Sequence, residues 1–264
     1  MNSEFIGVDV DDFRLPPRDA FRQAAELGFR SVEFATVAGD LAPQQLSHSG
    51  RRHLLRVIEG FGLQTAALVA DVPGQRLTDP RTVEERVTRT LQVIDLAADL
   101  DVRIITASVG ALTHPESGAI SELALEALRR MGEYADDRGR IFALRPSHDA
   151  GERLESVLKA VGCPAIQVGL DPAALIMSGV SPLEIVQRFA QGIALVHARD
   201  GSAGGADHSG RETRLGEGDV DFETVLASLE AAQYRGAYIL RRTDSQTPSK
   251  DLQEGLDRLR KIMR

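Results

Sequence analysis

Four charged side chains stand directly after short apolar runs of this sequence. Arg145, Asp171, His197 and Arg241 each follow three or four apolar or small residues. Burying a charge is unfavourable unless the charge is paired or used. A histidine or a carboxylate can move a proton, and an arginine can bind a carboxylate or phosphate through two parallel hydrogen bonds. Four such residues in the same relative position predict a shared central site for acid–base chemistry on an anionic molecule.

The elements that would position these residues alternate regularly along the chain. Short β-branched runs predict strands, and longer amphipathic stretches predict helices. Strands that alternate with helices pair in parallel, because a parallel connection needs a crossover. The expected strands are 5–10, 31–35, 65–69, 102–107, 141–144, 165–170, 193–196 and 237–240, and the expected helices are 17–27, 51–60, 81–96, 118–137, 182–190, 222–232 and 252–263.

Eight such units in 264 residues favour an α/β fold, a single (β/α)8 TIM barrel that spans residues 1–264 as one domain. The first turn has no G-x-G-x-x-G motif, which opposes a dinucleotide-binding sheet. The longest irregular stretch is 200–219, and loops of this length are usually functional or mobile.

Barrel enzymes place their reacting groups at the C-terminal ends of the strands. Glu33 on the second strand and His148 after the fifth are therefore further candidates. Asp9 lies at the end of the first strand, with Asp11 and Asp12 beyond it, and we expect the three to form a solvated loop and helix-cap cluster rather than a cation site.

Composition narrows the class of partner. The net charge of −8 opposes nucleic-acid binding, which needs clustered cations. No apolar run approaches the roughly 20 residues that span a bilayer, and the acidic N-terminus is unlike a signal peptide. Cys163 is the only cysteine, which excludes an internal disulfide and suits a reducing cytoplasm. We expect a cytoplasmic protein with a small-molecule anionic substrate, no nucleic-acid partner and no membrane partner; a homo-oligomer remains open.

A Schiff-base aldolase is a poor interpretation of this chain. Such an enzyme needs a lysine on a barrel strand. The only lysines are Lys159, Lys250 and Lys261, all in expected helices or loops.

Four segments resemble a known family. They are Val168-Gly169-Leu170-Asp171-Pro172, Val196-His197-Ala198-Arg199-Asp200, the block Leu215-Gly216-Glu217-Gly218-Asp219-Val220-Asp221-Phe222, and Tyr234-Arg235-Gly236-Ala237-Tyr238-Ile239. Over nearly its whole length the chain resembles the sugar phosphate isomerase/epimerase family within the xylose isomerase-like TIM barrel superfamily.

The resemblance implies one divalent cation held by Glu, Asp, His and Glu from strands five to eight, with the two glutamates moving a proton next to a carbonyl. Asp171 and His197 match two of these positions. Arg145 and Arg241 stand at the other two, and Ala174 stands where a histidine is common. A guanidinium has only donors and stays protonated, so it can be neither ligand nor base.

We therefore interpret the metal site as degenerate and expect no cofactor. A divalent cation (Mn, Mg, Zn or Co) is expected only if the site has rearranged around His197, Asp171, His148 and Glu33. The endonuclease branch of the superfamily would need a metal cluster. Its ligand pair resembles Asp207-His208, which lies several residues too early, so we expect a polar loop tip there.

These observations predict an isomerase/epimerase-like enzyme, with lyase-type chemistry also open, that acts on a small anionic polyhydroxylated or keto-acid substrate. The candidate catalytic residues are His197 and Asp171, with Glu33 and His148 in reserve; the candidate substrate-binding residues are Arg145, Arg241, Arg199 and Arg211. The alternative is a non-catalytic relative that binds an anionic metabolite or a protein partner, in which Arg145 and Arg241 neutralise Asp171.

Overall fold

The computed structural model of the chain describes residues 6–114, 116–146, 149–204 and 210–263. Eight parallel strands form a closed barrel in the order β1-β10-β7-β6-β5-β4-β3-β2, as the sequence predicts. The strands are β1 (Ile6–Asp9), β2 (Ser31–Ala35), β3 (Gln64–Val69), β4 (Ile104–Ser108), β5 (Ile141–Arg145), β6 (Ile166–Leu170), β7 (Ile193–Ala198) and β10 (Tyr238–Leu240).

Helices follow the strands along the described chain. Two of them, α5 and α6, lie where the sequence did not delimit a helix. The α-helices are α1 (Pro17–Glu26), α2 (His48–Gly60), α3 (Val83–Asp99), α4 (Glu122–Asp136), α5 (Glu152–Val161), α6 (Pro172–Met177), α7 (Pro182–Phe189), α8 (Phe222–Ala231) and α9 (Pro248–Ile262), and the 3-10 helices are η2 (Val10–Phe13), η3 (Gly39–Leu41) and η4 (Ala190–Gly192). Within the described residues, no helix is long and apolar enough to cross a membrane.

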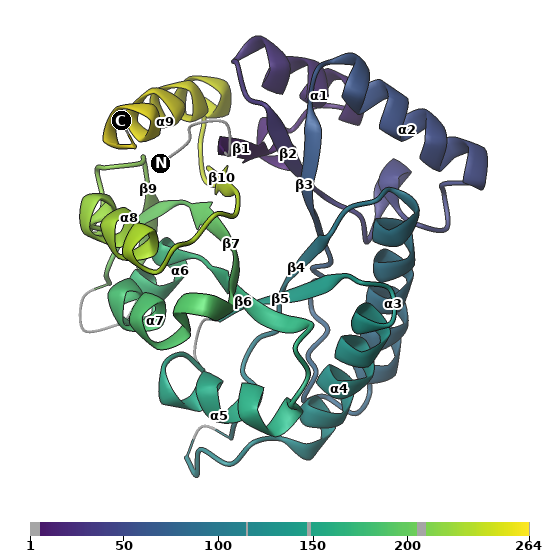
Figure 1. Ribbon diagram of the computed structural model, residues 1–264, viewed down its shortest axis with the longest axis vertical. Coiled ribbons are helices and arrows are strands. Elements are labelled where there is room, and N and C mark those ends of the chain that lie inside the picture. Colours follow the sequence, from purple (N-terminus) through teal and green to yellow (C-terminus); the bar gives the residue numbers. More distant parts are fainter. Residues whose placement is uncertain (1–5, 115, 147–148, 205–209, 264) are drawn as a thin grey trace. The chain divides into compact units, whose positions relative to one another are not determined.

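The chain divides into two compact units. The first comprises Met1–Phe34, Val57–Ala66 and Leu170–Arg264, and the second comprises Ala35–Arg56 and Ala67–Gly169. In the second unit β4 pairs with β3 and β5, and α3 and α4 lie side by side (Figure 1).

Strand register in the first unit decides which side chains become neighbours. β1 lies between β2 and β10, with Asp9 opposite Glu33 and Val8 opposite Leu240. β10 in turn pairs with β7, where Ile239 lies opposite His197. Because all four strands are parallel, their C-terminal ends lie at the same end of the barrel.

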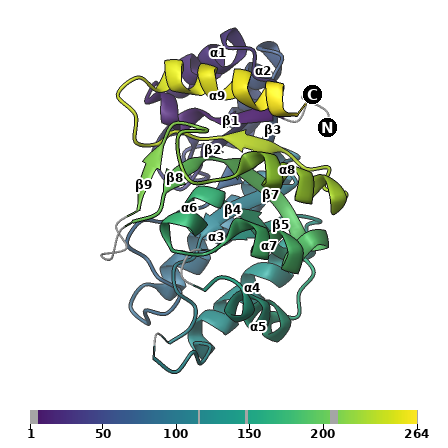
Figure 2. The ribbon, with the colours of Figure 1, turned by 90° about the vertical axis from the view of Figure 1, so that its left-hand side faces the viewer.

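The stretch 200–219 is not wholly irregular, so that expectation was wrong. β8 (Asp200–Ser202) pairs with β9 (Arg211–Thr213) as a short antiparallel hairpin (Figure 2). The strands are too short, and too rich in glycine and charge, for the apolar alternation that reveals a strand in sequence.

One buried carboxylate organises the segment after this hairpin. The side chain of Asp200 accepts hydrogen bonds from the backbone N–H groups of Gly216 at 2.7 Å, Gly218 at 3.1 Å and Val220 at 3.2 Å. Gly216 has φ +83°, and a Cβ at Gly218 would collide with the Asp200 carboxylate. The Leu-Gly-Glu-Gly block is thus held in place by the aspartate that follows strand β7.

Candidate functional site

A histidine and a glutamate meet inside the first unit. His197 Nε2 lies 2.7 Å from Oε2 of Glu33, and both side chains are 0% exposed. The two residues belong to β7 and β2, which are separated in the sheet by β10 and β1. The pair therefore crosses the interior of the barrel. Glu33, which the sequence offers as a reserve base, is therefore in contact with His197, the main candidate base.

The second ring nitrogen of His197 decides what the pair can do. Nδ1 is buried and has no hydrogen-bond partner among the described residues. When a neutral imidazole donates its Nε2–H to a carboxylate, its lone pair is at Nδ1. Nδ1 of His197 is therefore the atom that can accept a proton, and Glu33 orients the ring for it.

A buried guanidinium lies beside this pair. Arg241 follows β10 directly, and its Nε lies 3.0 Å from Oδ2 of Asp9. Burial would lower the pKa of Arg241, but the surrounding carboxylates raise it well above its ordinary value. In decreasing order of effect, these carboxylates are Asp9, Asp12, Glu33 and Asp171. Arg241 is thus a permanent cation at the centre of four acidic side chains.

Asp9 at the end of β1 and Asp12 in η2 are both buried, which corrects the expectation of a solvated cluster. Asp9 is 2% exposed and Asp12 is 5% exposed. Asp9 accepts a hydrogen bond from Asp11 N, so the helix-cap part of the prediction is confirmed. Burial raises the pKa of Asp9 well above its ordinary value and also raises the pKa of Asp12. Their role is to surround Arg241, which sequence position alone does not reveal.

Asp171 directly follows β6 and caps the N-terminus of α6. Its Oδ1 accepts a hydrogen bond from Ala174 N at 3.0 Å, and its Oδ2 lies 3.3 Å from Nη1 of Arg199. Burial would raise the pKa of Asp171, but Arg199 and His197 lower it below its ordinary value. Asp171 therefore stays ionised. Its ion-pair partner among the described residues is Arg199, and Arg241 acts on it at longer range.

Glu212, whose sequence position does not single it out, forms ion pairs with both Arg199 and Arg242. Glu212 on β9 lies 2.8 Å from Arg199 Nη2 and 3.1 Å from Arg242 Nη1, and its side chain is only 3% exposed. Nothing in its sequence context signals this role, because it lies in a glycine-rich stretch between strands. Arg211 next to it is exposed, and no ion pair joins it to another described residue.

The strand ends of the second unit carry a different pair. Arg145, at the end of β5, forms an ion pair with Asp71, and Asp71 also accepts a hydrogen bond from Ser108 N at 2.6 Å. Gly169 makes room for this arginine, because a Cβ there would lie 3.1 Å from Arg145 Cγ. Arg145 therefore has a carboxylate partner within its own unit.

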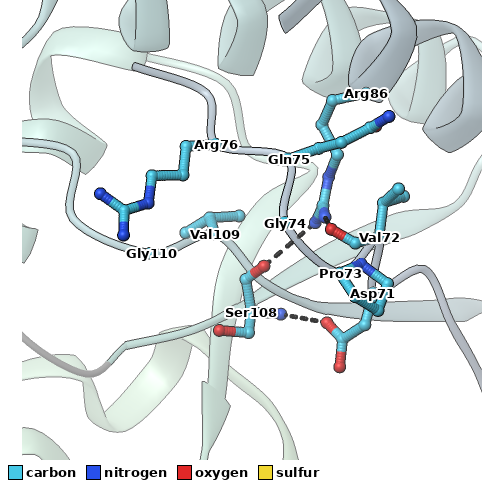
Figure 3. A pocket seen from close by; sticks show the side chains of 10 residues that line it. All are labelled: Asp71, Val72, Pro73, Gly74, Gln75, Arg76, Arg86, Ser108, Val109 and Gly110. Carbon is cyan, nitrogen blue, oxygen red and sulfur yellow. Dashed lines mark hydrogen bonds between the residues drawn. The ribbon is translucent and has the colours of Figure 1, made fainter. Parts of the chain in front are cut away.

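A cavity of about 370 Å³ opens beside this pair in the second unit (Figure 3). It lies between the loops that follow β3 and β4. Its lining residues are Asp71, Val72, Pro73, Gly74, Gln75, Arg76, Arg86, Ser108, Val109 and Gly110.

The donor set does not fit the divalent cation that the resemblance implies. Among the described residues, no three His, Cys, Asp or Glu side chains are placed to hold one metal ion. Nε2 of His197 faces Glu33, Asp171 faces Arg199, and Arg241 has no lone pair to offer. His148 of the rearranged set, and the pair Asp207-His208, lie outside the described residues.

The chain is similar to known proteins over almost its whole length. Residues 21–262 match the family described as xylose isomerase-like TIM barrel. No curated protein matches the sequence. Many solved structures share the fold, and the three given next do so at low sequence identity.

A xylose isomerase domain protein from Planctomyces limnophilus has a TM-score of 0.82 and 22% identity, covering 91% of this chain and 90% of its own. A D-tagatose 3-epimerase-like protein has a TM-score of 0.80 and 19% identity, covering 98% and 96%. The probable 3-DHS dehydratase AsbF, involved in petrobactin synthesis in Bacillus anthracis, has a TM-score of 0.78 and 16% identity, covering 97% and 98%.

Proposed function

Because the chain belongs to the xylose isomerase-like TIM barrel family, we propose that it is an isomerase- or epimerase-like enzyme that removes a proton from a carbon next to a carbonyl. Its substrate is a small anionic molecule, a polyhydroxylated acid or a keto acid, and it works without the divalent metal of its relatives. Similar structures named after an epimerase and a dehydratase support this reaction class, since epimerisation and elimination of water next to a carbonyl can both begin with such a proton transfer.

The observation that carries the proposal is the Glu33–His197 pair beside Arg241. Glu33 holds Nε2 of His197 at 2.7 Å and so leaves the lone pair on Nδ1. A base oriented by a carboxylate is a recurrent arrangement for proton abstraction. The arginines cannot take a proton, and Asp171 is held ionised by Arg199, so His197 is the best placed base.

The charge that forms during the reaction needs a cation. When Nδ1 of His197 takes the proton, the C–H electron pair stays on the substrate carbon and delocalises into the carbonyl. The product of this step is an enolate. Arg241 is 15% exposed, and its one ion-pair contact among the described residues is Asp9, through Nε. Its guanidinium stabilises the enolate oxygen and the neighbouring carboxylate by charge-assisted hydrogen bonds. For isomerisation, the imidazolium then returns the proton to the former carbonyl carbon, while the hydroxyl proton of the neighbouring carbon passes to the enolate oxygen. For elimination, it gives the proton to a leaving hydroxyl group, which departs as water.

Hydrogen exchange in D2O tests this proposal without knowledge of the product. Sugar acids, 2-oxo acids and ketoses are incubated with the protein and EDTA, and loss of the C–H signal next to the carbonyl is followed by proton NMR. We expect exchange with at least one anionic substrate, no exchange with His197→Ala, and a raised KM with Arg241→Met. Exchange that requires added metal, or that survives His197→Ala, contradicts the proposal.

A non-catalytic binding role is the second candidate, and one observation favours it. His197 and Glu33 are both 0% exposed, so a substrate reaches Nδ1 only if it displaces the side chains that cover it. If the protein only binds its ligand, we expect anionic compounds to raise the melting temperature of the wild type. None of the sugar acids, 2-oxo acids or ketoses should then undergo hydrogen exchange.

A further inference from the structure

The cavity beside Asp71 is built around a buried arginine. Arg86 extends from α3 into the space between two loops (Figure 3) and is 2% exposed. Its Nη1 donates to the carbonyl of Val72 at 3.1 Å, and its Nη2 donates to the carbonyl of Ser108 at 3.0 Å. These two bonds hold the guanidinium in a defined orientation at the cavity wall.

The charge of this arginine has no counter-ion in contact among the described residues. Asp71 is the one carboxylate on the cavity lining, and it is already paired with Arg145. Burial lowers the pKa of Arg86 accordingly. A buried cation that is not paired costs free energy, and an anion brought next to it removes much of that cost.

A second arginine adds positive charge to the cavity lining. Arg76 also lines the cavity; its side chain is exposed, and it forms no ion pair with another described residue. In Figure 3 the side chain of Arg76 extends away from Arg86, so it contributes charge to the lining rather than a contact with Arg86. The described lining therefore carries two arginines and one carboxylate, Asp71, which forms its ion pair with Arg145. Asp71 acts on Arg86, and Asp79 on Arg76, without an ion-pair contact.

Hydrogen-bond donors remain for a ligand. Each terminal nitrogen of a guanidinium carries two hydrogens, and the carbonyl bonds of Arg86 use one on each. Gly74 and Gly110 line the cavity with φ values of +76° and +70°, so no Cβ narrows the opening. The cavity volume lies at the lower end of the range for small-molecule sites, about 300–1,000 Å³.

We propose that this cavity binds the oxoanion group of a small molecule, a carboxylate or a phosphate, against the guanidinium of Arg86, with the charge of Arg76 adding to the attraction. The residues that carry this site are all in the second unit and differ from those that carry the proposed reaction.

Isothermal titration with inorganic phosphate and with acetate, at constant ionic strength, tests the site. We expect saturable binding of at least one probe to the wild type. Arg76→Met should weaken it by about tenfold, because one of the two positive charges on the lining is lost. Arg86→Lys keeps the charge but loses the forked geometry and should also weaken it. Arg81→Met is the matched control, since Arg81 is an exposed arginine that pairs with Asp79 and does not line the cavity.

A bulky side chain provides a second test that removes no charge. Ser108→Phe should block the cavity and abolish binding, with the fold checked by the melting temperature. Binding of phosphate alone or acetate alone supports the site and identifies its group. Absence of saturable binding, or equal affinity in the wild type and Arg76→Met, overturns the proposal. Hydrogen exchange is measured separately, so failure of the reaction leaves this result unaffected.

Discussion

His197 and Glu33 are 164 residues apart in sequence, yet Nε2 of the histidine lies 2.7 Å from Oε2 of the glutamate. The contact joins β7 to β2 across the interior of the barrel, with no water-accessible surface on either side chain. A carboxylate in this position fixes the histidine tautomer, and the tautomer determines which nitrogen can act as a base.

The tautomer is the first prediction. In protein labelled with 15N at histidine, we expect two-bond correlation spectra above neutral pH to show His197 protonated at Nε2 and unprotonated at Nδ1. Glu33→Leu removes the acceptor and should populate the Nδ1–H form, whereas Glu33→Gln keeps an acceptor oxygen and serves as the control. An Nδ1–H tautomer in the wild type would show that Glu33 does not orient the ring.

The second prediction concerns the ion pair of Arg241 and Asp9. Arg241→Met leaves buried carboxylates without their cation, and we expect the free energy of unfolding in urea at pH 7 to fall by about 3–5 kcal/mol. Adding Asp9→Asn to this variant should recover part of the loss, because one uncompensated charge is removed. Additive effects of the two substitutions would mean that the residues are not coupled.

Metal binding is the third. Calorimetric titration of the wild type with Mn²⁺ should show no tight one-to-one binding, because the guanidinium of Arg241 offers no lone pair. Arg241→Glu places a carboxylate at the end of β10, in the same unit as Asp171 and His197, and should gain measurable Mn²⁺ binding. An Arg241→Glu variant that binds no metal would show that the end of β10 does not correspond to a ligand position of the family.

The fourth prediction is a pH dependence at the N-terminal turn of α9. Burial would raise the pKa of Asp251, but its partners lower it below its ordinary value; in order of effect they are Ser245, Arg214, Arg242 and Thr247. A carboxyl whose pKa is depressed by folding stabilises the protein above its unfolded pKa, and this contribution is lost as the pH falls through the folded pKa.

Asp251→Asn should therefore reduce the free energy of unfolding by about 1–3 kcal/mol at pH 7, and by progressively less as the pH falls from about 4 towards the depressed folded pKa. Asp257→Asn is the control, because Asp257 is exposed on the same helix. The measurement is urea unfolding at pH 7 and at a series of pH values below about 4. A difference between Asp251→Asn and the wild type that does not shrink in acid would contradict the assignment.

The fifth prediction tests the hydrogen bonds by which the Asp200 carboxylate holds the backbone N–H groups of Gly216, Gly218 and Val220, here called the Asp200 clamp. Gly218→Ala places a Cβ against the Asp200 carboxylate, and we expect more than about 1 kcal/mol of destabilisation. Gly192→Ala is the matched control, because nothing lies within 4 Å of a Cβ there, and its effect should be within about 0.5 kcal/mol. Equal melting temperatures for the two variants would rule out the clamp.

The sequence by itself determined the fold and the places where charge would gather. Apolar runs that alternate with amphipathic stretches require parallel pairing, and eight of them close a barrel. Residues directly after those runs necessarily lie at strand ends, which is why His197 and Arg241 could be selected. That a guanidinium cannot bind a cation or take a proton follows from its chemistry alone.

Only the tertiary structure decided which charge meets which. Arg145 pairs with Asp71, Asp171 pairs with Arg199, and Glu33 orients His197. Strand register and the path of each loop set these contacts, and both depend on packing between segments far apart in the chain. Glu212 is the clearest case: only the β8–β9 hairpin brings it between Arg199 and Arg242. The residues around Glu212 in the sequence do not identify its partners, because these contacts form only when distant segments pack together.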